Sequence, residues 1–579
     1  MTPALQVAAG GDAAASLWRA TGAQAEAGTI KRVLHEGAGV VWPSSSPWLS
    51  TADDGQVLVV VDGLLHAGGG AAQGRTPTVK DLLATYRTHG DRLAEGLLGD
   101  YVVVVLDRVR RRLLVARDPV GVRPWHQAED GPRHAGATRA AALVALPWVD
   151  ASPDEAYAVR WLACEMRSEG RTFHRGVSTL APGRTWVRDP HGTRVLRHHT
   201  WQVEDTAGLG AADADALARE RLDLAVADRV RAAGQVSCDV SGGLDSSAVL
   251  GTTMLLGHQD VLAGRLVFES AAADERRWSD EVVSHWGVPI MSAAPWLPDD
   301  DEALELEKQL RRPPPDPNFL MFIPLYRALA DAGRGTGLTG IGGDDAFVAA
   351  SPASRLLSAA QLHRARQLRP VAAAALRHPR TTWAYQLRPA LRLRVRQGRS
   401  EPRGYVTRAA AQASGLTDLL CEPPQRLTGV YAIDDRASAS TNGYQAGILE
   451  DGAVVADLAG RRVSHPYFDP RLTAGVYGLD PSLAAEGGHS RAVQARAYAD
   501  RLPPLIAARR DKAEFSEVAH RLMLDDARLH AVTTGPLVER GWLDLLGFAR
   551  VVADARLKRP WAAQPVSRAV ALDSWLRRA

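Results

Sequence analysis

One short segment of the sequence combines residue types that could hold a nucleotide. The string SGGLDSS, Ser241 to Ser247, places two glycines, three hydroxyls and one carboxylate within seven residues. Gly242 and Gly243 would let the chain turn tightly and approach an anion, because glycine has no side chain. Asp245 could then hold a magnesium ion on the bound phosphates. The hydroxyls that could donate to phosphate oxygens are those of Ser241, Ser246 and Ser247.

The chemistry of this segment depends on the elements around it. A helix is predicted over residues 211–233, followed by the strand-like run QVSCDV, by SGGLDSS and by the helical stretch SAVLGTTMLLG. A strand, a glycine turn and a new helix aim several backbone N–H groups at one point, which suits phosphate. The alternative is a helix capped by serine and aspartate, with no ligand. The whole string in this context favours the phosphate site.

Two further runs, RLVFES and GLTGIGGDD, repeat this order more faintly, as expected for a parallel sheet covered by helices. Between about residues 56 and 146 the sequence differs. There the runs QVLVVVDG, DYVVVVLDR and RRLLVARD read as strands, with one helical stretch, KDLLATYRTHG. We therefore predict a β-rich domain over residues 1–200 and an α/β domain over residues 211–579, separated by a polar, glycine-bearing segment.

The bulk composition is that of an ordinary globular protein. The chain has 579 residues, 46% of them hydrophobic and 23% charged, and its net charge of +3 argues neither for nor against a polyanionic partner. Cys164, Cys238 and Cys421 are widely separated, which supports neither a disulfide framework nor a zinc site. The sequence shows no signal-peptide pattern and no apolar run long enough to cross a membrane, so we expect a cytoplasmic protein.

The most biased part of the sequence lies at about residues 361–410. It holds twelve arginines against the single acid Glu401, among alanines, leucines, Trp383 and Tyr385. One interpretation is a helical excursion that docks an acidic or extended partner. The other is an amphipathic helical cover whose arginines are simply solvated.

SGGLDSS resembles the pyrophosphate loop of the N-type ATP pyrophosphatases, and further segments in a fixed order resemble the asparagine synthetase family within that group. Together they span nearly the whole chain. Individually, each also has an ordinary interpretation as a turn, a helix cap or a solvated lysine. The matching segments are Gly99–Trp125, Thr172–Trp186, Leu338–Asp345, SHPYFDP at 464–470 and LPPLIAARRDKAEF at 502–515.

The resemblance implies an α/β protein of two unlike domains. Residues 1–200 would form a degenerate glutaminase-like domain, a β-rich sandwich of the N-terminal-nucleophile (Ntn) hydrolase type. Residues 211–579 would form an ATP-pyrophosphatase synthetase domain with a parallel sheet, and the arginine-rich segment would be an excursion from it. The expected cofactors are ATP and Mg²⁺.

The resemblance also implies roles for individual residues. Asp245 and Asp344 would hold magnesium, Gly340 would lie near the adenine or ribose, and Lys512 would neutralise charge that develops on the α-phosphate. The catalytic residues would then be Asp245, Asp344 and Lys512. The nucleotide would be held by Ser241, Gly242, Gly243, Asp245, Ser246, Ser247, Gly340 and Lys512.

Two departures from the family concern the release of ammonia from glutamine. Thr2 stands where glutamine-using members carry a nucleophilic cysteine, and Pro3 is a poor match to the family's start. Threonine can be an N-terminal nucleophile, but the family's glutaminase chemistry runs through a thioester. Asp62 precedes Gly63 where the family usually has asparagine, in a segment that helps to hold glutamine. We expect no glutaminase activity and an N-terminal domain whose RDPVGVRP turn serves packing.

A third departure concerns the attacking amine. Ile341 stands where asparagine synthetases carry a glutamate and β-lactam synthetases a tyrosine, residues that assist the nitrogen nucleophile. Isoleucine cannot move a proton, so the amine should already be largely deprotonated or be served by another group. An α-amino group, with a pKa of about 7.7–8.0, is more available at neutral pH than ammonia. The sequence therefore favours a peptide N-terminus as the nucleophile.

These features together most resemble a lasso peptide cyclase. Such an enzyme adenylates an Asp or Glu side chain of a precursor core peptide and joins it to the peptide's own N-terminal amine, releasing AMP and pyrophosphate. The implied partners are the precursor peptide, a leader peptidase and a leader-recognition protein, with no membrane and no nucleic acid. The arginine-rich segment and Arg311–Phe322 could grip the precursor or be inert cover.

Three alternatives stay open. One is a β-lactam synthetase-like or asparagine synthetase-like enzyme that acts on a small amino acid substrate. Another, from a different class, is an RNA-binding ATP-pyrophosphatase relative, although the paired cysteines expected for sulfur transfer are absent. The last is an inactive scaffold, which the intact acidic residues argue against.

Overall fold

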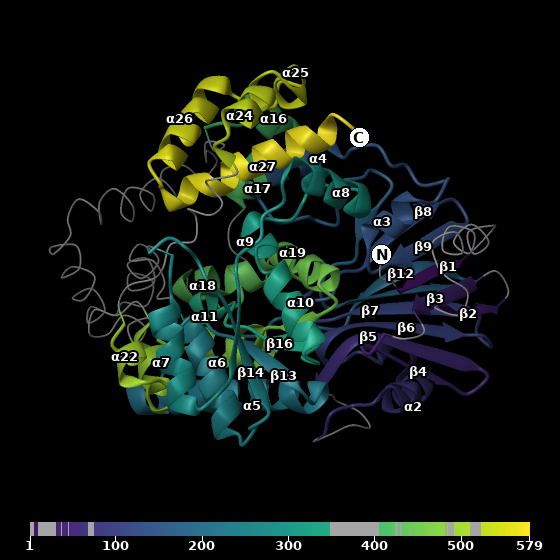
Figure 1. The fold of residues 1–579 in the computed structure, drawn as a ribbon. Coiled ribbons are helices and arrows are strands. Elements are labelled where there is room, and N and C mark those ends of the chain that lie inside the picture. The colour runs from purple at the N-terminus through teal and green to yellow at the C-terminus, as the bar shows by residue number, and fades with distance from the viewer. Residues whose placement is uncertain are drawn as a thin grey trace.

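The computed structural model shows three regions of different architecture. In Figure 1 the N-terminal strands lie on the right, a sheet with flanking helices at the lower left, and the C-terminal helices on top. The described residues are 5–9, 30–35, 38–43, 46–67, 75–271, 273–347, 404–422, 426–428, 431–441, 443–480, 483, 491–509 and 523–579. Thr2, Lys512 and residues 361–403 of the arginine-rich segment lie outside them.

The N-terminal region contains two antiparallel sheets packed face to face. Strands β5 (Val57–Ala67) and β6 (Leu98–Asp107) pair along their lengths. Because side chains alternate along a strand, Val102 of β6 points between the sheets and Val103 points to the outer face. One sheet has the order β10 (Ser178–Thr179), β8 (His126–Asp130), β9 (Arg133–Ala137), β1 (Gln6–Ala9), β3 (Ala38–Pro43), β2 (Ile30–His35). The other has the order β12 (Gly192–Arg197), β11 (Arg184–Asp189), β7 (Arg112–Arg117), β6, β5, β4 (Leu49–Asp53).

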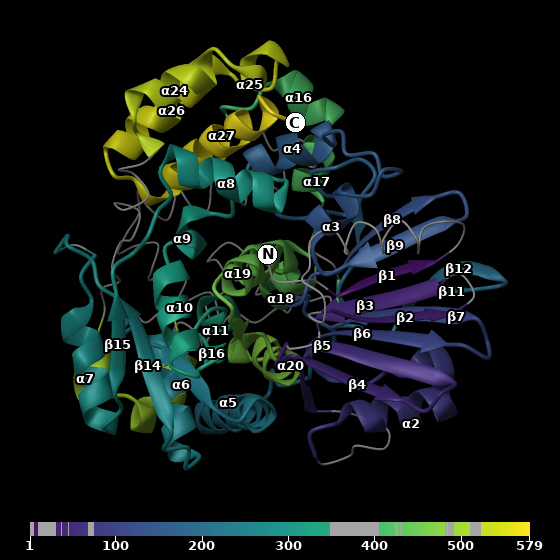
Figure 2. The same cartoon turned by 45° about the vertical axis from the view of Figure 1, so that its right-hand side comes forward.

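Helices cover the outer faces of both sheets. Helix α2 (Val79–His89) packs Leu82 and Tyr86 against the second sheet, and the Tyr86 hydroxyl donates to the buried Asp107 carboxylate at 2.9 Å. Helix α3 (Ala140–Val144) packs against the first sheet. Both sheets are visible at the right of Figure 2. The arrangement confirms the predicted β-rich sandwich.

The following region is built on a parallel sheet. Its order is β15 (Ile290–Ala293), β14 (Val261–Leu266), β13 (Val236–Asp239), β16 (Thr336–Leu338), β17 (Arg462–Ser464). Each of these pairings is parallel. Because β13 and β16 are neighbours, the loops that follow them emerge side by side at the carboxyl edge, where α/β sheets bind ligands. The predicted α/β architecture is confirmed.

Two helices hold the central strand of this sheet. Helix α5 spans Ala211–Ala233, the bounds predicted from the sequence, and α6 spans Leu244–Leu255 directly after the glycine turn. Val226 of α5 and Val249 of α6 share one buried core with Cys238 of β13. The start of α6 is thereby fixed against the strand that leads into SGGLDSS.

The third region is helical and joins distant parts of the chain. Helix α4 (Glu155–Leu162) precedes residue 200, yet its Trp161 packs with α27 (Pro560–Leu576), beside which it lies in Figures 1 and 2. Other members of this core come from α16 (Arg408–Ala413), α24 (Asp526–Thr533) and α26 (Leu545–Arg556). The segment before β11 therefore contributes to the C-terminal helical core as well as to the sandwich.

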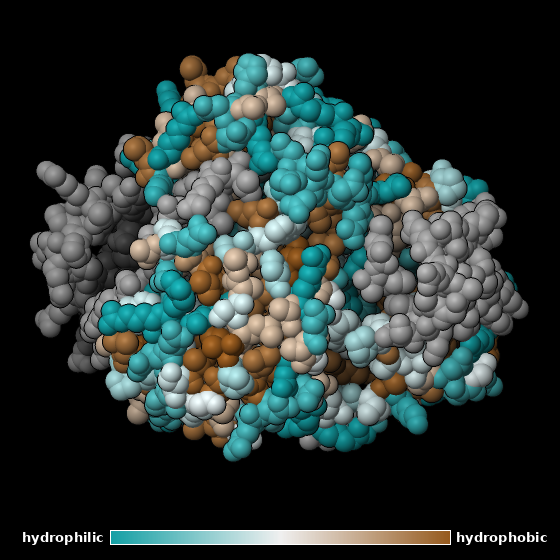
Figure 3. Space-filling model, viewed as in Figure 1, coloured by the Kyte–Doolittle hydropathy of each residue, from teal (hydrophilic) through white to brown (hydrophobic). Residues whose placement is uncertain are grey.

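Apolar side chains are scattered among polar ones on the face shown in Figure 3. Large apolar side chains that stay exposed include Leu546, Leu557 and Trp561 of the C-terminal helices. In the described part of the chain, no helix is both long enough and apolar enough to span a bilayer.

Candidate functional site

SGGLDSS forms a tight loop between β13 and α6. Gly242 has φ of 76°, and a side-chain carbon there would lie 2.3 Å from Cβ of Trp278, so only glycine fits. Ser241 Oγ accepts a hydrogen bond from the Gly243 amide at 3.2 Å and lies 3.2 Å from Ser246 Oγ. The loop is therefore held by its own glycines and serines.

The second predicted loop, Leu338–Asp345, lies directly against the first. A side-chain carbon on Gly343 would lie 2.2 Å from Oδ1 of Asp245, and one on Gly340 would lie 2.6 Å from the backbone nitrogen of Ser246. Glycine at both positions thus permits the close approach of the two loops. The structure brings Gly340 and its neighbour Asp344 to SGGLDSS, as the resemblance implies.

A single arginine joins the two predicted metal ligands. Nη1 of Arg491 lies 2.8 Å from each carboxylate oxygen of Asp245 and 2.8 Å from Oδ1 of Asp344. The Gln494 side-chain amide donates to Asp245 Oδ1 at 2.6 Å. Because both carboxylates converge on one positively charged group, their geometry suits a cation between them.

The two carboxylates fit a magnesium ion that is bound together with a nucleotide. Proteins usually hold magnesium with one or two carboxylates and phosphate oxygens. Among the described residues, no group of three or more His, Cys, Asp or Glu side chains is placed to hold a metal ion. Burial raises the pKa of Asp245, and Asp344 raises it further, while Arg491 opposes both. The residues that would hold the ion are Asp245 and Asp344.

Both loops open into a cavity of about 670 Å³, a size typical of small-molecule sites. Ser241, Gly243, Asp245, Ser246 and Gly340, all predicted to bind nucleotide, line it. Apolar residues form another part of its wall. They are Leu266, Phe268, Ile341, Phe319, Met321 and Phe322.

Two predicted nucleotide ligands do not line this cavity. Ser247 is completely buried, and its Oγ has no hydrogen-bond partner among the described residues. Gly242 packs against Trp278, so its role is to shape the loop. Lys512 lies outside the described residues, so its predicted role stays a prediction.

Three arginines that line the cavity, Arg265, Arg491 and Arg509, were not predicted. Arg491 joins the carboxylates as described, and Arg509 donates to the Gly242 carbonyl at 3.0 Å. The Arg509 guanidinium also lies 2.9 Å from Glu275 and stacks 4.6 Å from the Trp278 ring centre. Arg509 therefore stabilises the SGGLDSS loop. Its one sequence signal was its place in the basic segment 502–515.

Ile341 belongs to an apolar cluster that joins the two halves of the chain. The RDPVGVRP turn supplies Val120 and Val122, and helix α19 (Tyr444–Leu458) supplies Leu449. We call this cluster the apolar partition. Its members are Val120, Val122, Trp201, Ile341, Leu449 and Phe468.

Hydrogen bonds within the RDPVGVRP turn hold its shape, and the turn contacts the C-terminal half of the chain. The Asp118 carboxylate accepts hydrogen bonds from four backbone amides, those of residues 120–123. Gly121 approaches α19 so closely that a side-chain carbon would lie 3.1 Å from Cβ of Ala446. The turn thus serves packing between the two halves, as predicted.

Asp62, at the position linked to glutamine binding, is taken up by ion pairs. It lies 3.2 Å from Arg123 of the same half and 2.9 Å from Arg462 of the other half. Both arginines also contact Asp457, and the Arg139 guanidinium lies 3.6 Å from the Asp457 carboxylate. Burial alone would raise the pKa of Asp62, but the two arginines outweigh it and lower the pKa. This buried ion cluster leaves Asp62 no free hydrogen-bonding role.

The segment Arg311–Phe322 includes the short helix α9 (Pro317–Leu320), so it is not extended throughout, and it contacts both halves of the chain. The Arg311 carbonyl oxygen lies 2.6 Å from a ring nitrogen of His174, and Arg312 forms an ion pair with Asp451. Its last residues, including Phe319 and Phe322, line the 670 Å³ cavity. The segment is therefore placed to contact a substrate, although its arginines are already engaged.

Comparisons with known families match most of the chain. The asparagine synthase family matches residues 217–577, which is more than half of the sequence. A glutamine amidotransferase domain matches residues 68–201. The two matches meet near the change from sandwich to parallel sheet.

Curated relatives match over shorter regions. The amidases chry2 of Gibberella zeae and chyE of Penicillium rubens are each 26% identical over 291 residues, covering 46% of this chain and 42% of each relative. The glutamine-hydrolyzing asparagine synthetase 3 of Bacillus subtilis is 27% identical over 187 residues, 32% of this chain and 30% of that protein. The chain thus matches less than half the length of each.

Two solved structures have low overall similarity. Glutamine phosphoribosylpyrophosphate amidotransferase from B. subtilis, complexed with ADP and GMP, is 10% identical with a TM-score of 0.23, covering 50% of this chain and 65% of that one. A structure of the allosteric regulatory enzyme of purine biosynthesis is 11% identical with a TM-score of 0.24, covering 61% and 77%.

Proposed function

The chain belongs to the asparagine synthase family, and from this premise we propose that it is an ATP-dependent, AMP-forming amide synthetase, a carbon–nitrogen ligase. The observation that carries the proposal is the convergence of Asp245 and Asp344 on one cationic point beside the SGGLDSS loop. That arrangement would place a magnesium-bound nucleotide at the mouth of a cavity with room for a second substrate.

The reaction would proceed in two steps. A substrate carboxylate attacks the α-phosphorus of ATP, which forms an acyl-adenylate and releases pyrophosphate. An amine then attacks the acyl carbon, and AMP leaves as the amide forms and a proton is lost from nitrogen. Magnesium, when bound, supplies positive charge that stabilises the leaving pyrophosphate. Backbone amides of SGGLDSS and the Arg491 guanidinium would orient the phosphates and stabilise the same charge.

The nucleophile would be a ready-made amine. Asp62, at the position linked to glutamine binding, is committed to the buried ion cluster, so an amine that does not come from glutamine is favoured. Ile341 faces the cavity from an apolar cluster and can accept no proton. A peptide α-amine, partly unprotonated near neutral pH, meets both conditions.

We therefore infer that the enzyme is a lasso peptide cyclase. Its substrate would be a leader-cleaved core peptide, whose Asp or Glu side chain is adenylated and then joined to the N-terminal amine as a macrolactam. The aromatic wall that includes Phe319 and Phe322 supports a substrate with apolar side chains. A leader peptidase and a leader-recognition protein would supply the substrate.

The test uses the purified full chain with ATP, magnesium and a lasso precursor whose leader is removed by its protease. We expect AMP, pyrophosphate and a peptide lighter by one water. ADP as the nucleotide product would contradict the whole proposal. AMP formation with small amino acid substrates but with no precursor would contradict the peptide substrate alone.

A second candidate is an enzyme that acts on a small amino acid substrate. It is supported by the match to a bacterial asparagine synthetase. Incubation with ATP and aspartate, with ammonium as the amine, would then give AMP and asparagine. Turnover in that assay at a rate above that with the peptide would favour this candidate.

A further inference from the structure

A second cavity, of about 270 Å³, lies where the sandwich meets α19. The sandwich contributes His126 and the hairpin of β11 and β12, and α19 contributes Glu450. No described residue of the nucleotide cavity lines it. It is therefore a separate cavity with its own chemistry.

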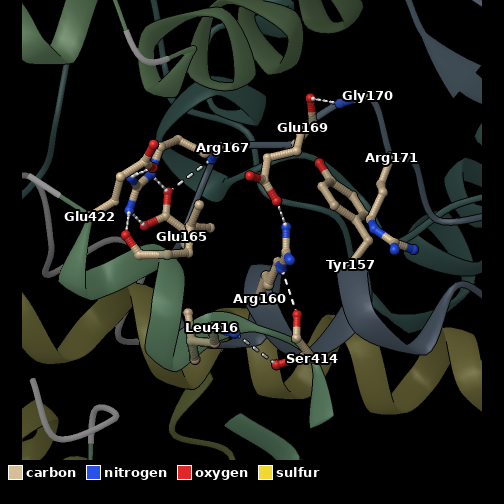
Figure 4. Close-up of polar contacts among 12 residues, drawn as sticks. Tyr157, Arg160, Glu165, Arg167, Glu169, Gly170, Arg171, Ser414, Leu416 and Glu422 are labelled. Carbon is tan, nitrogen blue, oxygen red and sulfur yellow. Dashed lines mark hydrogen bonds and ion pairs between the residues drawn. The ribbon is translucent and has the colours of Figure 1, made fainter. Parts of the chain in front are cut away.

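The two acids that line this cavity already have partners. Figure 4 shows the Glu169 carboxylate directed at Arg160, whose Nη1 donates to it at 2.5 Å. Glu450 lies 3.7 Å from His126 and 4.0 Å from Arg312. These carboxylates are therefore engaged away from the hairpin.

Two arginines of the hairpin line the cavity without such a partner. Arg184 on β11 and Arg197 on β12 stand directly opposite each other in the strand pairing. Within the described ranges, neither contacts a carboxylate. Like charges placed directly opposite on paired strands destabilise the pair. Burial lowers the pKa of Arg184, and the charge of Arg197 lowers it further. A bound anion would reduce both the repulsion between the two arginines and the unfavourable burial of the Arg184 charge.

The inner part of the cavity offers an unused polar atom. His126 is 3% exposed, and its Nδ1 has no hydrogen-bond partner in the part of the chain that the structure describes. Burial lowers the pKa of His126 to about 4, so its ring is neutral near pH 7 and has one donor and one acceptor. Buried polar atoms normally have a partner, which a ligand would provide here.

We propose that this interface cavity binds a small oxyanion, a carboxylate or a phosphate, through Arg184 and Arg197. Paired N–H donors of guanidinium groups match both kinds of oxyanion. The other cavity arginines are committed, since Arg171 pairs with Asp154 and Arg117 donates to backbone carbonyls. The apolar partition separates this site from the nucleotide cavity, so the site is independent of the proposed reaction.

The test measures binding of inorganic phosphate and of citrate to the full chain by equilibrium dialysis. Magnesium and the uncleavable α,β-methylene analogue of ATP are present to occupy the nucleotide loop. The informative variant is Arg197→Glu, which places a carboxylate opposite Arg184. Arg188→Glu is the matched control, because Arg188 lies on β11 with Arg184 and donates to the Pro132 carbonyl outside the cavity.

We expect saturable binding in the wild type, and a dissociation constant raised about tenfold or more in Arg197→Glu. The same variant should unfold at a higher temperature, because an opposite-charge pair replaces a like-charge pair. Binding of citrate alone would identify a carboxylate ligand, and binding of phosphate alone a phosphorylated one. No saturable binding of either probe, or equal affinity in Arg197→Glu and wild type, would overturn the proposal.

Discussion

Asp62 is a buried aspartate and Asp245 a partly exposed one, and both contact arginine, yet their surroundings have opposite charge balance. Around Asp62, two carboxylates meet three arginines, and the pKa of Asp62 is lowered by Arg123 and Arg462. Around Asp245, one guanidinium is shared with Asp344, the neutral Gln494 amide also donates to Asp245, and burial raises the pKa of Asp245. The first site is neutralised and closed, whereas the second lines an open cavity.

The difference shows that the two aspartates do different things in the structure. In the N-terminal half, the residue linked to glutamine binding now fastens the sandwich to β17 through Arg462. In the other half, the negative charge is only partly compensated, so a further cation is favoured when nucleotide binds. The same residue type thus lies in a closed ion cluster where arginines outnumber carboxylates, and lines a cavity where they do not.

The largest expected effect comes from removing the charge at the open site. Asp245→Asn keeps the shape of the side chain but loses its negative charge, so magnesium and the phosphates are no longer held together. Synthetase activity, measured as pyrophosphate release, should fall by roughly 10²–10³-fold or more. Thermal stability should change little or rise, because burial of the charge opposes folding.

Asp344→Asn serves as the parallel variant at the second carboxylate and should show a similar loss. If either variant retained full pyrophosphate release, the assignment of these carboxylates to the metal would be wrong. If both variants unfolded, the two carboxylates would act on stability as Asp62 is expected to, and the contrast between the two sites would be wrong.

The same substitution at the closed site should act on stability instead. Asp62→Asn restores the family's usual residue but leaves Arg123 and Arg462 short of negative charge in a buried position. The free energy of unfolding should fall by about 3–5 kcal/mol, measured by urea denaturation. Activity per folded molecule should stay near the wild-type value, and no glutaminase activity should appear. An Asp62→Asn protein as stable as the wild type would show that the ion cluster does not stabilise the contact between the two halves.

Acid should affect the two halves unequally. Burial lowers the pKa of His126 and of His198 to about 4, and holds that of His66 well below its usual value. All three lie in the N-terminal half. The unfolded chain therefore binds more protons as pH falls from about 6.5 towards 4, and stability is lost in that window. At about pH 5 the loss is on the order of 2 kcal/mol for each of His126 and His198.

Two buried carboxyl groups of the N-terminal half, Asp100 and Asp118, work in the opposite direction, because burial raises their pKa values. Burial raises the pKa of Asp100 to about 6, so its contribution is present at low pH and lost as pH rises through 6. The net effect should still be destabilisation by acid. Hydrogen exchange at about pH 7 and about pH 5 should show the sandwich opening first. Earlier exchange in the parallel sheet would contradict this order.

The smallest effect is expected at the N-terminus. Thr2→Ala should leave both the rate of amide formation and the stability unchanged, because the family's cysteine is already absent. Comparison of steady-state rates with the peptide substrate checks this. A loss of activity would mean that the N-terminal half still performs chemistry, and the contrast between the two sites would fail.

Local patterns were enough to predict the main elements. The helix at Ala211–Ala233 and the β-rich runs follow periodicity and composition, and SGGLDSS follows from a strand, a glycine turn and a helix. The adjacency of Asp344 to Asp245 came from the family resemblance, since no local rule joins two loops so far apart in the sequence.

Residues brought together by the tertiary fold could not be predicted. Arg491 meets Asp245 across 246 positions, and Arg462 meets Asp62 across 400. The sequence around an arginine in a basic stretch does not show whether its side chain is solvated or pairs with a buried carboxylate. Ser247 illustrates the reverse case, because its hydroxyl suits phosphate but the pitch of α6 turns it into the core.

The apolar partition has a consequence for how efficiently ATP would be used. An acyl-adenylate is destroyed by any water molecule that reaches it before the amine. Val120 of the partition lines the interface cavity and Ile341 lines the nucleotide cavity, so apolar side chains stand between the described parts of the two. Such an apolar wall should direct more of the ATP consumed into amide bonds and less into hydrolysis.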